Sequence, residues 1–165
     1  MRYAIVGNSG SGKSTLARKL GANAGIEPVD LDEIYWEPEK PGVRRDLAEA
    51  SADLLSKLEG QECWIVEGCY EELIEVVLPL EPKLIWLEPG EAVCLEHCRN
   101  RPWEPHKYSS REAQDRNLEM LLRWVSDYYR RTGPMSYQVH KQLYANYDGE
   151  KECIGLAGDA GDGRD

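Results

Sequence analysis

Short apolar runs alternate with stretches of helical period along most of the chain. The runs at 3–6, 63–66 and 83–88, with weaker ones at 26–32 and 151–154, are suited to buried strands. Between two of them, apolar residues recur at helical spacing, as in Leu47, Ala50, Leu54 and Leu58. This alternation predicts an α/β protein with a five-stranded parallel sheet covered by helices on both faces.

Helix ends are predicted from capping residues and helix breakers. The first helix should stop at Gly21. Asp46 with Glu49, and Ser109 with Glu112, have the spacing of a capping box, so helices should begin at both places, the second running to 131. Further helices are predicted over 70–78, 91–100 and 136–147.

The chain has 165 residues, of which 41% are hydrophobic, a size typical of one compact domain. We expect a single domain over 1–156 and a flexible polar tail over 157–165, which is rich in Gly and Asp. An export signal and a membrane-spanning apolar run are both missing from the sequence, which predicts a cytoplasmic protein that does not insert into membranes.

Net charge and cysteine content argue against some kinds of function and of binding site. A net charge of −10 makes non-specific nucleic-acid binding unlikely, because the phosphate backbone would be repelled. Five cysteines, an odd number, favour reduced thiols. Cys94 and Cys98 share a helical face, but a second ligand cluster that would complete a zinc site is missing, so buried thiols are favoured.

The most specific signal is a phosphate-binding loop between the first strand and the first helix. It matches the pattern G-x-x-x-x-G-K-[ST], in which backbone amides and a helix amino terminus hold phosphates. We expect ATP to bind here, with Lys13 at its β and γ phosphates and Ser14 on a Mg²⁺ ion. The predicted nucleotide-binding residues in this segment are Gly7, Asn8, Ser9, Gly10, Ser11, Gly12, Lys13, Ser14 and Thr15.

Ligands of open parallel sheets bind at the carboxyl ends of the strands, which selects further candidates. Asp30, Asp32, Glu67, Gly68 and Glu88 fall at or just beyond predicted strand ends. If the strand over 26–32 continues to its end, Asp30 and Asp32 point the same way. The alternatives are a solvated turn for the two aspartates and an exposed strand-end carboxylate for Glu67.

The segment 101–108 combines two prolines with aromatic and basic residues and lacks a regular period, so it reads as a loop or lid. Trp103 on this segment suggests a contact made in a closed state. Tyr35 and Trp36 are interpreted as core aromatics, with stacking on an acceptor as the alternative. His106 and His140 are interpreted as surface or packing residues rather than bases.

Two classes of nucleotide-binding protein fit poorly. A signalling GTPase needs N-K-x-D and D-x-x-G motifs, which are not present in the sequence. Large motor and transporter ATPases need a much longer chain. A small kinase fits better, because it needs a second binding site beside the γ-phosphate and arginines that neutralise the transferred group.

The chain resembles the adenylate kinase and shikimate kinase group of P-loop enzymes over most of its length. It is most similar to the adenylate-kinase-related proteins described as DNA topology modulators, on segments 7–15, 29–36 and 64–70 and on an arginine-containing lid. The resemblance implies a three-layer P-loop NTPase fold with a five-stranded parallel sheet and a helical lid over about 99–116 that closes over ATP. It also implies an acceptor-binding region after the second strand.

The resemblance also implies residue roles. Asp30 would hold Mg²⁺ through water, and Asp32 would orient the acceptor hydroxyl. Glu67 would lie near Mg²⁺ or its water shell, and Glu67 and Gly68 would belong to the substrate-binding residues. Arg44 or Arg45 would present a cation to the acceptor. The lid arginines, which stack on adenine or clamp phosphates in the resembled families, are Arg99, Arg101, Arg111 and Arg116. The fuller arginine pattern of true adenylate kinases is missing here, which weakens AMP as the acceptor.

Taken together, these features predict an ATP- and Mg²⁺-dependent phosphotransferase acting on a small-molecule or nucleotide acceptor. Lys13, Asp32 and Arg101 are the predicted catalytic residues, and Arg99 and Arg116 are expected to contact nucleotide and substrate. The alternative is a nucleotide-dependent regulatory module whose closure over ATP signals to a partner without phosphorylating a small molecule.

Overall fold

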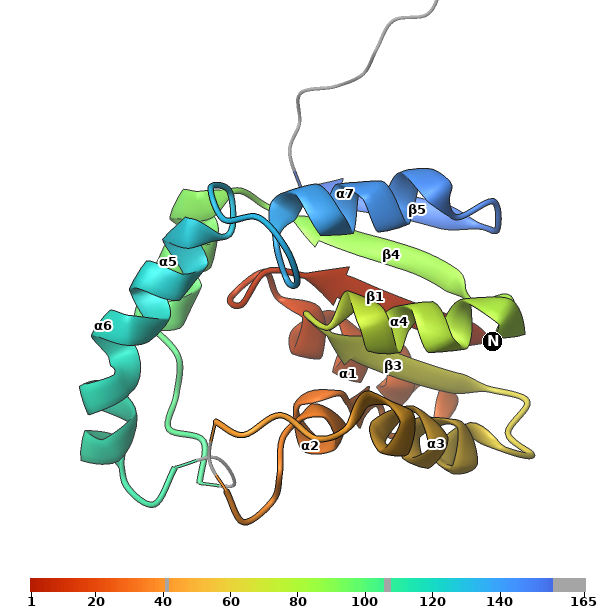
Figure 1. Cartoon of the computed structure of the whole chain (residues 1–165), viewed down its shortest axis with the longest axis horizontal. Helices are drawn as coiled ribbons and strands as arrows, with labels where there is room; N and C mark the ends of the chain where they lie inside the picture. Colours follow the sequence, from red (N-terminus) through yellow and green to blue (C-terminus); the bar gives the residue numbers. More distant parts are fainter. Residues whose placement is uncertain (41, 106–107, 156–165) are drawn as a thin grey trace, which may run out of the picture.

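A computed structural model describes residues 1–40, 42–105 and 108–155 of the chain (Figure 1). Five parallel strands form one sheet in the order β2-β3-β1-β4-β5. They are β1 (Arg2–Gly7), β2 (Val29–Asp30), β3 (Trp64–Gly68), β4 (Lys83–Glu88) and β5 (Lys151–Gly155). The predicted five-stranded parallel sheet is confirmed, whereas the predicted tail over 157–165 and His106 lie outside the described residues.

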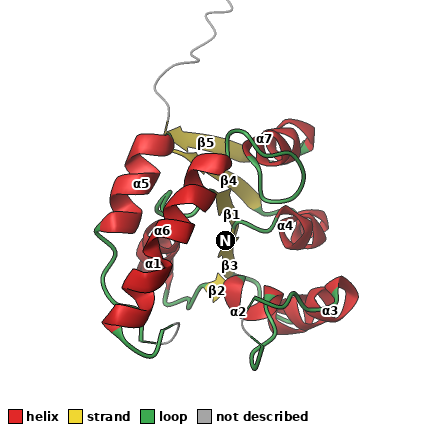
Figure 2. Ribbon diagram, turned by 60° about the vertical axis from the view of Figure 1, so that its left-hand side comes forward, coloured by secondary structure: helices red, strands yellow, loops and turns green. Residues whose placement is uncertain are grey.

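Helices cover the sheet on both faces, which gives three layers (Figure 2). One side carries α1 (Lys13–Ala24), α5 (Glu91–Arg99) and α6 (Arg111–Asp127). The other side carries α3 (Leu47–Leu58), α4 (Glu71–Val77) and α7 (Tyr137–Asn146). The short helix α2 (Asp32–Tyr35) follows β2, and the 3₁₀ turn η1 (Leu78–Leu80) follows α4.

Successive side chains of a strand point into two different hydrophobic clusters, one on each face of the sheet. In β1, Ala4 and Val6 belong to the cluster under α3, α4 and α7, while Ile5 belongs to the cluster under α1. Trp86 and Ile85 of β4 divide in the same way. Burial on both faces explains why these strands appear in the sequence as uninterrupted apolar runs.

A third, smaller cluster joins α5 to α6. Cys94 and Cys98 are 0% and 2% exposed and pack with Val125, so the prediction of buried helix thiols is confirmed. Within 1–40, 42–105 and 108–155, His, Cys, Asp and Glu side chains form no group of three or more that could hold a metal ion.

The predicted helix starts differ in accuracy. Asp46 caps α3 as expected, because its carboxylate accepts hydrogen bonds from the amides of Ala48 and Glu49 at 2.9 and 3.1 Å. The cap of α6 is Ser110 and not Ser109, since the Ser110 hydroxyl accepts from the Ala113 amide at 3.1 Å.

The first helix does not stop at Gly21 but continues to Ala24, and Gly25 in the left-handed conformation (φ 67°) ends it. Gly21 serves packing instead: a Cβ there would lie 2.2 Å from the carbonyl oxygen of Ile26. The chain turns back tightly against α1 at this point, because the Ile26 amide donates to the Gly21 carbonyl at 2.9 Å.

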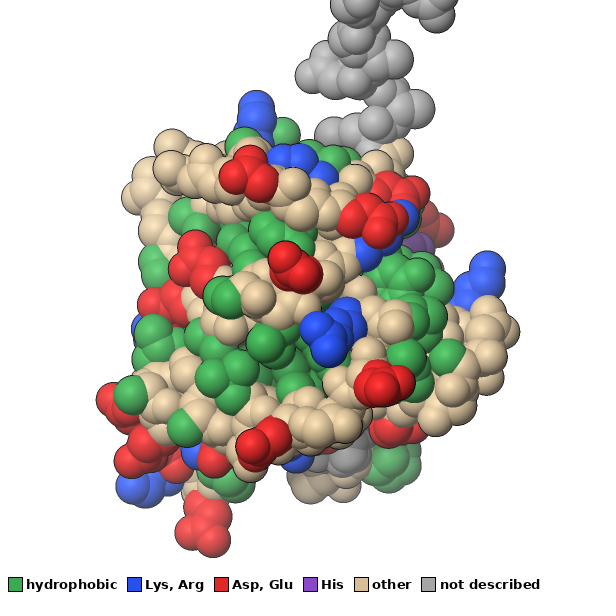
Figure 3. All heavy atoms as spheres, turned by 90° about the vertical axis from the view of Figure 1, so that its right-hand side faces the viewer, with side chains coloured by type: hydrophobic (Ala, Val, Ile, Leu, Met, Phe, Trp, Pro, Cys, Tyr) green, Lys and Arg blue, Asp and Glu red, His purple; other side chains and the backbone are tan. Residues whose placement is uncertain are grey.

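The opposite end of the sheet, where the strands begin, carries an apolar groove with a volume of about 710 Å³. Figure 3 shows hydrophobic side chains gathered in the middle of this face. Its apolar lining includes Leu55, Leu58, Trp64 and Leu80, and its polar lining includes Arg2, Ser56, Glu59, Gln61 and Glu62. Across the described part of the chain, every helix is too short or too polar to cross a membrane.

We predict that Gly21→Ala lowers the free energy of unfolding by about 1–3 kcal/mol, although alanine is the better helix former, because the added methyl group meets backbone. Urea denaturation measures the change. The exposed neighbour provides a comparison: Ala22→Gly should cost about 1 kcal/mol through helix propensity alone. A more stable Gly21→Ala protein would show that this close approach does not constrain the fold.

Candidate active site

The phosphate loop joins β1 to α1 at the carboxyl edge of the sheet. Helix α1 begins at Lys13 without a side-chain cap at Gly12, so amides of its first turn are left for a ligand. Gly10 packs directly on α5, because a Cβ there would lie 2.3 Å from the Cys94 carbonyl oxygen. The His97 Nδ1 atom also lies 2.7 Å from the Gly10 carbonyl oxygen, to which it donates.

Two polar side chains hold the loop in shape. Lys13 is 8% exposed, and its Nζ donates to the Asn8 carbonyl at 2.8 Å, across the loop. The Asn8 side chain accepts from the Ser9 amide at 2.8 Å and donates to the Val125 carbonyl of α6 at 3.0 Å. The loop is therefore preformed and tied to α6.

Glu67, at the end of β3, lies beside the loop. It is 4% exposed, so the interpretation as an exposed carboxylate is wrong. Burial raises the pKa of Glu67, while the nearby Lys13 ammonium and a hydrogen bond from the Ser14 hydroxyl lower it. The structure thus brings three predicted residues together at one point of the loop.

The two aspartates also meet at this edge, but not as strand neighbours. Asp30 ends β2 and is aligned with Glu67 in the β2–β3 register. Asp32 begins α2, and its amide donates to the Asp30 carboxylate at 2.9 Å. The predicted strand over 26–32 is therefore too long, since only Val29 and Asp30 are paired.

An aromatic cluster stands beside Asp32. Tyr35 is 4% exposed and stacks on Tyr70 with ring centroids 4.0 Å apart, which confirms its interpretation as a core residue. Trp36 is half-buried, and its indole N–H donates to the Tyr70 hydroxyl at 2.8 Å. The Tyr70 hydroxyl donates in turn to the Asp32 carboxylate.

The two arginines before α3 face different partners. Arg44 forms an ion pair with Glu72 at 2.8 Å, and its guanidinium lies 5.3 Å from the centre of the Tyr35 ring. Arg45 pairs with Asp53 and donates to the Ile34 carbonyl at 3.2 Å. Arg45 therefore links α2 to α3, and Arg44 is the one of the two that lies at the aromatic cluster.

The lid region runs from the end of α5 to the start of α6, and among its described residues, 99–105 and 108–116, helix is found only at these two ends. Arg99 and Arg101 line a cavity of about 20 Å³ with Tyr108, and Arg101 pairs with Glu104 at 3.3 Å. Arg116 is exposed on α6, as is Arg111, which pairs with Asp115. Trp103 is 44% exposed.

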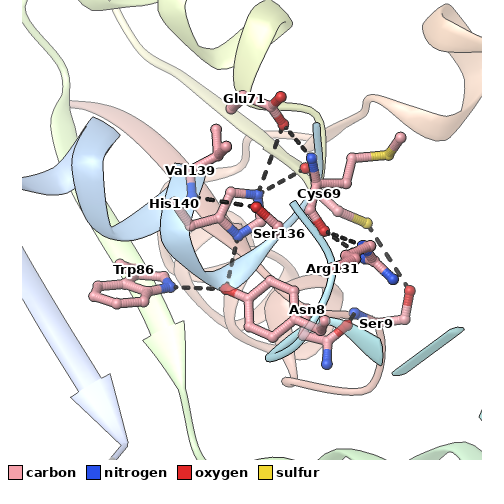
Figure 4. A network of polar contacts seen from close by, with 11 residues as sticks. Asn8, Ser9, Cys69, Glu71, Trp86, Arg131, Ser136, Val139 and His140 are labelled. Carbon is pink, nitrogen blue, oxygen red and sulfur yellow. Dashed lines mark hydrogen bonds and ion pairs between the residues drawn. The ribbon is translucent and has the colours of Figure 1, made fainter. Parts of the chain in front are cut away.

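A buried polar network next to the loop was not predicted from the sequence (Figure 4). His140 is 0% exposed; its Nε2 donates to the Cys69 carbonyl at 2.8 Å, and its Nδ1 accepts from the Tyr128 hydroxyl at 2.9 Å. Burial lowers the pKa of His140 to about 4, so its ring is neutral at pH 7. The one sequence signal is its position three residues before Leu143 on the buried face of α7.

The same network connects three segments that are distant in the sequence. The Glu71 carboxylate accepts from the Met135 amide at 2.8 Å, and the Arg131 guanidinium donates to the Met135 carbonyl. The Cys69 Sγ lies 3.9 Å from the Ser9 hydroxyl of the phosphate loop. The connection from α6 to α7 is thereby joined to the carboxyl end of β3 and to the loop.

Glu88, at the end of β4, is a second buried carboxyl group at this edge. It is 2% exposed and accepts a hydrogen bond from the Tyr129 hydroxyl. Burial raises its pKa, an effect that this hydrogen bond partly opposes.

The order of the strands, the phosphate loop and the helices on both faces define the three-layer α/β fold of the P-loop NTPases. No protein-family model and no curated protein sequence matches the chain. Among solved structures, shikimate kinase from Bacteroides thetaiotaomicron is similar at 16% identity, over 94% of this chain and 86% of that one, with a TM-score of 0.52. This likeness supports the fold.

Two further solved structures also match. Deoxyadenosine kinase from M. mycoides with bound dATP is 16% identical over 94% of this chain and 91% of that one, with a TM-score of 0.48. A gluconokinase from Sinorhizobium meliloti 1021 is 17% identical over 87% of this chain and 89% of that one, with a TM-score of 0.47.

We predict that His140→Gln reduces the loss of stability on acidification. The unfolded state takes up a proton on histidine near pH 6.5, whereas the folded state does so only near pH 4, so this group should cost about 2 kcal/mol between pH 7 and pH 5. Urea denaturation at both pH values measures the difference.

The buried carboxyl groups of Glu67, Glu71 and Glu88 act with the opposite sign. Their pKa values are raised, so the folded state binds protons first and gains stability as the pH falls. The relevant quantity is therefore the difference between wild type and variant, and an equal acid-induced loss in both proteins would contradict the prediction.

Proposed function

We propose that the protein is a phosphotransferase that uses ATP and Mg²⁺ and phosphorylates a small-molecule or nucleotide acceptor. The observation that carries the proposal is the convergence of Lys13, Ser14 and Glu67 at one point of the phosphate loop, with Asp30 aligned beside Glu67. Besides Glu67, two further carboxylates, Asp30 and Asp32, lie at this edge. A protein that only binds nucleotide does not need them, whereas a phosphotransferase can use them to orient an acceptor.

Lys13 and the loop amides are suited to hold the phosphate groups of ATP. The Lys13 ammonium already lies over the loop, bound to the Asn8 carbonyl, so a rotation of its side chain would carry it to phosphate oxygens. The uncapped amides of α1 add hydrogen-bond donors and the positive end of the helix dipole.

The residues present fit a Mg²⁺ ion. The Ser14 hydroxyl would bind it directly, and Glu67 and Asp30, aligned on neighbouring strands, would bind its waters. Since the described residues form no metal cage of three or more ligands, phosphate oxygens and water would complete the coordination shell, as Mg²⁺ prefers. When bound, the ion neutralises charge on the phosphate groups.

Asp32 is our candidate for orienting the acceptor hydroxyl. It lies at the start of α2, joined through its own amide to Asp30 and thus to the loop edge. Arg44, which lies beside the aromatic cluster, is our candidate for contacting the acceptor. Arg101, Arg99 and Arg116 flank the irregular connection, where closure would bring a guanidinium to the transferred group.

We predict that Lys13→Ala abolishes acceptor-dependent release of ADP and leaves the fold intact. The reason is that the ammonium group that would stabilise negative charge on the phosphate groups in the transition state is removed. A coupled assay for ADP measures turnover with pooled nucleotides, sugars, hydroxy acids and cofactor precursors. Lys19→Ala, an exposed lysine on the same helix, is the matched control and should keep full activity. Near-normal turnover by Lys13→Ala would overturn the proposal.

We predict that Asp32→Asn lowers the acceptor-dependent rate by about 10²–10³-fold without weakening ATP binding, since a neutral amide cannot attract the proton of the acceptor hydroxyl as a charged carboxylate does. Glu33→Gln, the exposed next residue of α2, is the control and should act like wild type. If the wild-type protein binds ATP tightly and no acceptor raises its basal rate of ADP release, the nucleotide-dependent regulatory module would instead be favoured.

A further inference from the structure

We infer that Tyr70 is the positioning residue that holds Asp32 in its working orientation. The inference rests on the proposed function, because it assigns to Tyr70 a role in the reaction through Asp32. It is carried by a chain of hydrogen bonds from Trp36 through Tyr70 to Asp32.

The direction of this chain follows from the chemistry of its members. An indole N–H can only donate, so the Tyr70 oxygen accepts from Trp36 at 2.8 Å. The Tyr70 hydroxyl proton is then directed to the Asp32 carboxylate. Burial raises the pKa of Tyr70 far above its usual range, which keeps this proton on the tyrosine at any working pH.

Tyr70 is itself held rigidly. Its side chain is 4% exposed, stacked on Tyr35 at 4.0 Å and met edge-on by Trp36 at 6.2 Å. Gly68 makes room for it, because a Cβ on Gly68 would lie 3.1 Å from the Tyr70 ring and 2.7 Å from the Leu31 Cβ. Gly68 thus serves the packing of Leu31 and Tyr70, and the substrate contact predicted for it stays a prediction.

The placement of Tyr70 explains why this residue can act on Asp32. Tyr70 precedes α4 and follows the carboxyl end of β3, whereas Asp32 begins α2 after β2. Their side chains meet across two adjacent strand ends, beside Glu67 and the loop. A hydrogen bond from a fixed donor restricts rotation of the carboxylate, and proper orientation of a reacting hydroxyl depends on such restriction.

Tyr70→Phe tests the inference, since it removes the hydroxyl and keeps the ring. We expect kcat to fall about 10-fold with the KM for ATP unchanged, because the carboxylate that orients the acceptor loses the donor that fixes it. Asp30, Glu67 and Cys69 also face Asp32 and are the same in both proteins. Tyr144→Phe, on α7 at the opposite edge of the sheet, is the matched control (Figure 1).

A double-mutant cycle separates positioning from a general effect on structure. If Tyr70 acts through Asp32, Tyr70→Phe should have no further effect on kcat in the Asp32→Asn background. Carbon NMR of the Asp32 carboxyl group gives a readout independent of turnover: its chemical shift should change in Tyr70→Phe and stay unchanged in Tyr144→Phe.

The outcomes distinguish this inference from the proposed function. Acceptor-dependent turnover by wild type, with additive losses in the cycle or an unchanged Asp32 carboxyl signal in Tyr70→Phe, would overturn the role of Tyr70 alone. A wild-type protein that phosphorylates none of the pooled acceptors would overturn the proposed function, and the role of Tyr70 with it.

Discussion

The central place of β1 in the sheet is the constraint on which the site depends. Because β1 pairs with β3 on one side and β4 on the other, the loop that follows it emerges between the ends of both strands. Glu67 and Glu88 therefore flank the phosphate loop from opposite sides. The apolar residues of these strands set the register of the pairings. The register in turn decides which carboxyl groups lie beside the phosphate loop.

The strands, the phosphate loop and the position of Glu67 could be predicted from sequence, because each depends on local pattern and on the rule that parallel strands end at one edge. Features that depend on distant contacts could not. Asp30 and Asp32 lie together because the chain turns after β2, where the Leu31 amide donates to the Glu67 carbonyl. A glycine is needed at position 21 because the chain passes close to α1 at Ile26. His140 finds its partners 71 and 12 residues away, at separations with no sequence signature.

An acidic chain that binds an anion must keep its carboxyl groups from repelling the ligand. Partners do part of this, since the Lys13 ammonium lies near Glu67 and the Tyr129 hydroxyl donates to Glu88. Ion pairing does the rest for Glu72, which is matched by Arg44. The net charge of −10 thus describes the surface better than the edge at which phosphate would bind.

The two helices that flank the lid are both fastened to the phosphate loop at their bases, α5 where Cys94 and Cys98 pack against Gly10 and α6 where the Val125 carbonyl meets Asn8. The connection between them is consequently not needed to hold the phosphate loop in place. Its length and composition can vary without disturbing the loop, so the way the site is covered can change while the residues proposed to hold phosphate stay in place.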